Sequence, residues 1–62
     1  MNAILHQYRD FAWEVRSASG ALLALITWDK DYGTYYVCAE MGEAESFPSL
    51  DEAFTYATEG LA

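Results

Sequence analysis

The hydrophobic positions change their spacing along the chain, and one segment, Ala21 to Trp28, is apolar on both of its alternating faces. Its eight residues are too few to cross a bilayer, which takes roughly 20 residues as a helix. Turn-forming residues flank the segment, with Ser19-Gly20 before it and Asp29 to Gly33 after it. This pattern predicts a buried strand at the centre of a sheet.

The neighbouring segments alternate with a period of two and predict further strands. Phe11 to Arg16 alternates most clearly, and Thr34 to Glu40 is rich in β-branched and aromatic residues. Glu45 to Phe47 is expected to form a short edge strand that Pro48 ends. The core side of the first of these strands is predicted to carry Phe11, Trp13 and Val15. In the strand predicted at Thr34 to Glu40, Cys38 is expected to be a small buried apolar residue.

The N-terminal segment, Met1 to Asp10, is compatible with two conformations. Ile4, Leu5 and Tyr8 share one face of a helix, and Asn2 is a suitable cap, so we interpret the segment as a short helical turn. An extended conformation is the alternative.

A helix is predicted from Ser49 onward. Ser49 and Glu52 have the spacing of a capping box, in which the serine hydroxyl accepts a hydrogen bond from a backbone N–H near the start of the helix and the glutamate three residues on reaches back. Gly60 is placed to end the helix. The apolar stripe of this helix consists of Leu50, Ala53, Phe54, Ala57 and Leu61.

Short connections make consecutive strands neighbours in a sheet. We therefore predict one domain over residues 1–62, of class α+β, with a three- to four-stranded antiparallel meander and a C-terminal helix packed on one face. A single short helix covers only one side of such a sheet. The other face requires the N-terminal segment, a second copy of the chain or a partner protein.

Composition narrows the class of partner. Ten acidic residues against three basic ones give a net charge of −7, and 53% apolar residues argue against disorder. Phosphate groups of nucleic acids or of anionic membranes would be repelled, so direct binding to either is not expected. The charge favours cationic partners, with simple solubility as the alternative explanation.

Residues suited to catalysis or metal binding are few. A single cysteine excludes an internal disulfide, and Cys38 with His6 falls short of a structural zinc site. Asp29 to Glu40 partly matches a calcium-binding EF-hand loop, but its glycine falls one place early and its flanks are predicted strands. We therefore expect a cytoplasmic, non-enzymatic protein without cofactor or metal.

The carboxylates are predicted to gather at the two ends of the sheet. In a meander, the turn with Asp29 and Asp31 and the helix start with Asp51 and Glu52 lie at the same end. The opposite end receives Glu40, Glu43 and Glu45. Tyr32 lies beside the first group as a candidate aromatic anchor. These eight residues form the predicted partner-binding site.

In size, layout and carboxylate excess the chain resembles small acidic phage proteins that disable host defence, the anti-CRISPR proteins in particular. The resemblance covers the short acidic chain, the aromatic-rich meander from Phe11 to Glu40 and the capped helix from Ser49. These proteins share no common motif, so no functional residue is transferred from them. The resemblance implies binding to a CRISPR-Cas effector, through its basic DNA channel or at a recruitment surface.

Two hypotheses follow. The first is an inhibitor that occupies the basic surface of a nucleic-acid-handling protein through the acidic groups. The second is a structural or regulatory module that forms a homodimer through the uncovered sheet face.

Overall fold

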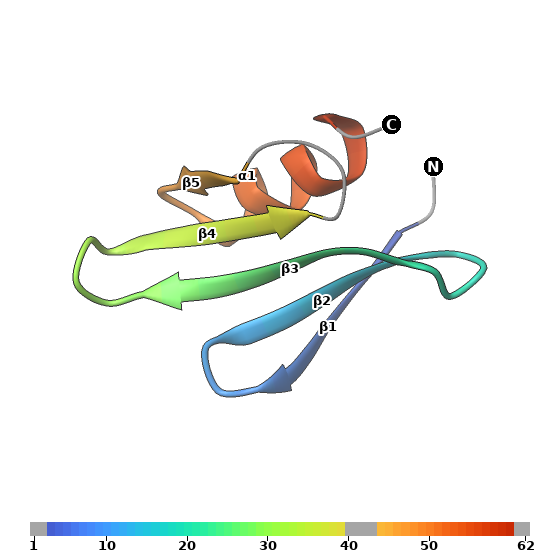
Figure 1. The fold of residues 1–62 in the computed structure, drawn as a ribbon, viewed down its shortest axis with the longest axis horizontal. Coiled ribbons are helices and arrows are strands. Elements are labelled where there is room, and N and C mark those ends of the chain that lie inside the picture. The colour runs from blue at the N-terminus through green and yellow to red at the C-terminus, as the bar shows by residue number, and fades with distance from the viewer. Residues whose placement is uncertain (1–2, 40–43, 61–62) are drawn as a thin grey trace.

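The computed structural model describes residues 3–39 and 44–60, which form one five-stranded antiparallel sheet and one short helix (Figure 1). The strands are β1 (Ala3–Arg9), β2 (Ala12–Ser17), β3 (Leu22–Asp29), β4 (Thr34–Ala39) and β5 (Glu45–Phe47). Their order in the sheet is their order in the sequence. The predicted α+β class is confirmed, and β3 is the central strand, as its apolar pattern indicates.

The hydrophobic core lies on one face of the sheet, which we call the helix face. Its cross-strand rows follow from the register, because residues that pair directly across strands point to the same side. Ile26 of β3 pairs with Trp13 on one side and Val37 on the other. Both Ile26 and Val37 are fully buried, as is Val15 in the next row. These β-branched residues fill the centre of the core.

The helix α1 (Leu50–Thr55) covers part of this face and continues as a π-helical turn, η1 (Tyr56–Gly60). Ser49 caps it as predicted: its hydroxyl accepts a hydrogen bond from the backbone N–H of Glu52 at 3.2 Å and donates to the Glu52 carboxylate at 3.3 Å. Ala53 and Ala57 are buried in the core cluster. Because both side chains are small, the helix lies close to the strands.

The helix covers only part of the width of the sheet. In Figure 1, α1 lies along β4 and β5, and η1 reaches β3, whereas the β1–β2 hairpin extends away from the helix.

Aromatic rings complete the core between the strands. Tyr35 lies between Trp28, at 4.8 Å between ring centroids, and Trp13, at 5.6 Å.

Three expectations are wrong in detail. The N-terminal segment is not a helical turn but the edge strand β1, so the sheet has five strands instead of three or four. Pairing with β2 satisfies the backbone groups that face that strand, and the alternation of Leu5 inward and Ile4 outward outweighs the helical spacing. Phe11 is not a core residue of β2, because it lies in the turn before that strand and is exposed.

Candidate interaction surface

The face of the sheet opposite the helix, here called the open face, has no covering element among the described residues. Its side chains follow from the same registers. One row across the strands is His6, Glu14, Leu25 and Cys38. The next row is Arg9, Ala12, Thr27, Tyr36 and Ser46. Ala12 is buried here although it does not belong to the core cluster, which shows that this face has some packing of its own.

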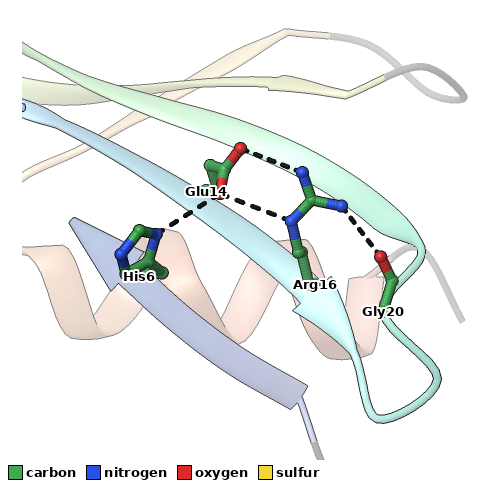
Figure 2. Close-up of polar contacts among 4 residues, drawn as sticks. All are labelled: His6, Glu14, Arg16 and Gly20. Carbon is green, nitrogen blue, oxygen red and sulfur yellow. Dashed lines mark hydrogen bonds and ion pairs between the residues drawn. The ribbon is translucent and has the colours of Figure 1, made fainter. Parts of the chain in front are cut away.

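A charged cluster occupies the β1–β2 half of the open face (Figure 2). The Arg16 guanidinium donates to both carboxylate oxygens of Glu14, from Nη2 at 3.0 Å and from Nε at 3.3 Å. His6 Nδ1 lies 3.4 Å from the same carboxylate. Arg16 Nη1 also donates to the Gly20 carbonyl at 2.8 Å, which ties the cluster to the β2–β3 turn. Gly20 suits that turn, because its φ of 94° is unfavourable for residues with a side chain.

The ion pair favours the charged forms of Glu14 and Arg16. The hydrogen bonds from Arg16, and secondarily from His6, hold the pKa of the Glu14 carboxyl below its ordinary value. Glu14 in turn raises the pKa of the Arg16 guanidinium. Since Glu14 is only 23% exposed, this part of the open face presents a paired, internally compensated group of charges.

An apolar area adjoins the cluster on β3 and β4. A shallow pocket of about 290 Å³ is lined by Leu22, Leu23, Ala24, Leu25, Cys38 and Ala39. Leu22 is exposed, and so is Cys38, which corrects the prediction that this thiol is buried. Cys38 belongs to the open face, which the helix does not cover. Ile4 lies on the same face and is also exposed.

A second hollow, of about 600 Å³, lies where β3 enters its turn. Its lining consists of Phe11, Thr27, Trp28, Asp29, Lys30 and Tyr36. We call it the aromatic hollow, because two exposed aromatic residues from different hairpins, Phe11 and Tyr36, contribute to it. The Phe11 carbonyl accepts a hydrogen bond from the Trp28 N–H at 2.9 Å, which joins the β1–β2 turn to β3.

The residues of the predicted partner-binding site lie in different surroundings. Asp29 is half-buried at the end of β3, and its Oδ1 accepts a hydrogen bond from the Asp31 N–H at 3.0 Å. Asp31 and Tyr32 are exposed in the turn, Tyr32 to 81%. Glu45, Asp51 and Glu52 are exposed on β5 and α1. Glu40 and Glu43 lie outside the described residues.

The strand register supports a common end of the sheet for the Asp29–Asp31 turn and the start of the helix. Phe47 pairs with Tyr35, so β5 ends near the start of β4, and the helix begins three residues later, at Leu50, on the side of the Asp29–Asp31 turn. That these carboxylates act together stays a prediction. The sequence did not reveal the exposed position of Phe11 at the aromatic hollow or the His6–Glu14–Arg16 cluster. The alternation of Glu14 with Trp13 and Val15 did place Glu14 on the opposite face.

In the described part of the chain, no three His, Cys, Asp or Glu side chains are grouped to hold a metal ion. His6 and Cys38 lie in one row but on strands three positions apart, roughly 14 Å at the usual strand spacing, so they do not form a nucleophile–base pair.

Comparison of the chain with protein families, with curated proteins and with solved structures gives no match. Among the helical residues that the structure describes, no segment has the length and apolar character needed to span a membrane.

Proposed function

We propose that the protein is a non-enzymatic binding protein that inhibits a basic, nucleic-acid-handling protein by occupying the surface that normally contacts nucleic acid. A CRISPR-Cas effector in the cytoplasm of a bacterial host is the partner that the anti-CRISPR resemblance suggests.

The observation that carries this proposal is the unequal pairing of charges. Among the side chains described, in residues 3–39 and 44–58, the only carboxylate in an ion pair is Glu14. Asp31, Glu45 and Asp51 are exposed and form no ion pair in the described structure, in a chain of net charge −7. Carboxylates that are not neutralised within the fold attract a positively charged surface and raise the rate of association with it.

The positions of the basic residues also support binding to a cationic partner. Arg9 and Arg16 lie in rows of the open face, and Lys30 lines the aromatic hollow. The chain has no other Lys or Arg. The helix and β5 therefore present carboxylates without cations of their own.

Binding to a DNA-binding protein tests the proposal. The chain is immobilised, proteins are captured from a bacterial lysate at about 50 mM salt, and each captured protein is assayed for DNA binding with and without the chain. We expect competition with DNA and a loss of roughly tenfold or more in affinity at about 500 mM salt.

The double variant Asp31→Lys/Asp51→Lys should abolish capture, whereas the matched control Asp31→Glu/Asp51→Glu should retain it. Binding that is indifferent to salt and to charge reversal would reject the mechanism.

A second candidate function, homodimerisation through the open face, is favoured by the exposed apolar residues Ile4 and Leu22 beside the 290 Å³ pocket. Sedimentation at micromolar concentration should then show a dimer that Leu22→Asp dissociates. The control Ala21→Asp adds the same charge one residue earlier, outside β3, and should leave the dimer intact. A native monomer would reject this candidate.

A further inference from the structure

Phe11 is the one described residue other than glycine with a positive φ, 62°. This left-handed conformation is unfavourable for a bulky side chain and costs about 1–2 kcal/mol relative to the right-handed region. Burial does not compensate, because Phe11 is 62% exposed. Backbone strain that holds an aromatic ring in solvent is typical of a functional position.

The strained turn places Phe11 at the aromatic hollow. Tyr36 reaches the hollow from β4 and is 42% exposed, so two aromatic residues are accessible there. The indole ring of Trp28 packs against Tyr35 instead, with the two ring planes tilted by 52°. Asp29 also lines the hollow, and its carboxylate accepts the hydrogen bond from the Asp31 N–H. The hollow therefore combines aromatic surface with an oriented carboxylate.

We propose that the aromatic hollow binds an arginine side chain of the basic partner, and this inference rests on the proposed function. A guanidinium plane stacks on aromatic rings and pairs with a carboxylate through two parallel hydrogen bonds, whereas an ammonium group does neither as well. Lys30 opposes a cationic ligand at this place, but the surrounding charge is negative, with Asp29 and Asp31 beside it and −7 over the chain. An anchor of this kind concentrates binding energy in a few residues.

The probe is a synthetic peptide of alternating glycine and arginine, compared with versions that carry lysine or the neutral isostere citrulline. Binding is measured by titration calorimetry, and the site by backbone amide chemical shifts. We expect the arginine peptide to bind roughly tenfold more tightly than the lysine peptide, and the citrulline peptide not to bind. The largest shifts should occur at Phe11, at Thr27 to Lys30 and at Tyr36.

Two charge variants should change the affinity for the arginine peptide in opposite directions. Asp29→Asn should weaken binding of the arginine peptide by roughly five- to tenfold, because the charge-assisted hydrogen bonds are lost. Lys30→Gln should tighten binding about two- to threefold, because it removes the opposing cation. Weaker binding with Lys30→Gln together with unchanged binding of Asp29→Asn would overturn the assignment of a cationic ligand.

Substitutions of Phe11 separate the ring from the strain. Phe11→Ala and Phe11→Gly both remove the ring and should lose binding, whereas Phe11→Trp should retain it. The glycine variant should melt about 4–8 °C above the alanine variant, because glycine adopts a positive φ without strain. Equal melting temperatures, or binding that survives in both variants, would overturn the role given to Phe11.

The outcomes also distinguish the two proposals. Shifts that gather at the start of α1, with binding weakened by Asp51→Asn and not by Asp29→Asn, would refute the hollow and leave the acidic inhibitor in place. Equal binding of the arginine and citrulline peptides would show that charge does not drive association, and would contradict both.

Discussion

The two faces of the sheet use the same strands for different purposes. On the helix face, Ile26 of β3 is fully buried beneath the helix and its neighbours. On the open face, its sequence neighbours Leu25 and Thr27 are half-buried and exposed. The two sides of β3 are similarly apolar in sequence, yet only one of them is covered. Apolar character alone therefore does not indicate which side of a central strand becomes core.

The two faces of the sheet also differ in their charged residues. Charged partners of the open face, Glu14 and Arg16, neutralise each other at hydrogen-bond distance. The described residues include no buried polar or charged residue. The helix face thus carries the core and the open face does not, so substitutions on the two faces should have different consequences for stability.

The largest effect is expected for Ile26→Ala. Truncation of a fully buried side chain leaves a cavity and should cost about 2–5 kcal/mol of the free energy of unfolding. A domain of this size has only a few kcal/mol of stability, so the variant should be largely unfolded. Circular dichroism with urea unfolding measures the loss.

The matched control for this comparison is Leu25→Ala, on the open face of the same strand. It should cost about 1 kcal/mol, because its side chain is already partly in solvent. Equal losses for the two variants would mean that the open face is buried in solution, as in a dimer.

An intermediate effect is expected for Ser49→Ala, which removes the cap of the element that covers the helix face. The N–H of Glu52 loses its acceptor, and unfolding free energy should fall by about 1 kcal/mol. Thr55→Ala, at an exposed position of the same helix, is the control and should change stability little. Similar losses in both variants would show that the cap does not hold the helix on the sheet.

The smallest effect concerns the charged cluster of the open face. Because the pKa of Glu14 is lowered in the folded state, the unfolded state binds more protons as the pH falls below the ordinary value of 4.5. The contribution of Glu14 is therefore present above that pH and is lost as the pH falls through the lowered pKa.

Glu14→Gln should flatten this part of the stability–pH profile, measured by urea unfolding between about pH 2 and pH 6. Glu45→Gln, an exposed carboxylate without an ion pair in the described structure, provides the control and should leave the profile nearly unchanged. An unaltered profile for Glu14→Gln would contradict the cluster.

Several elements were predictable because local physics determines them. The capping serine at Ser49 is recognisable from its spacing to Glu52, and the central strand from its flanking turns and two-sided apolar pattern. The strand Glu45–Phe47 was predicted with its observed bounds. In each case the signal lies within a few residues of the element.

The N-terminal strand could not be read from its own residues. Ile4, Leu5 and Tyr8 suit a helix as well as a strand, and pairing with β2 decides between them. The turn at Phe11 was missed for a related reason: the alternation continues through it in the sequence, while the hairpin requires a reversal there.

The sequence by itself determined the class of the fold, the central strand, the capped helix and an acidic chain with three cations. These properties depend on neighbouring residues or on composition. Only the tertiary structure decided which side of β3 is covered, which residues join the His6–Glu14–Arg16 cluster, and that Phe11 is held in solvent at the aromatic hollow. These depend on register and on the position of the helix, which bring together residues that are distant in the chain.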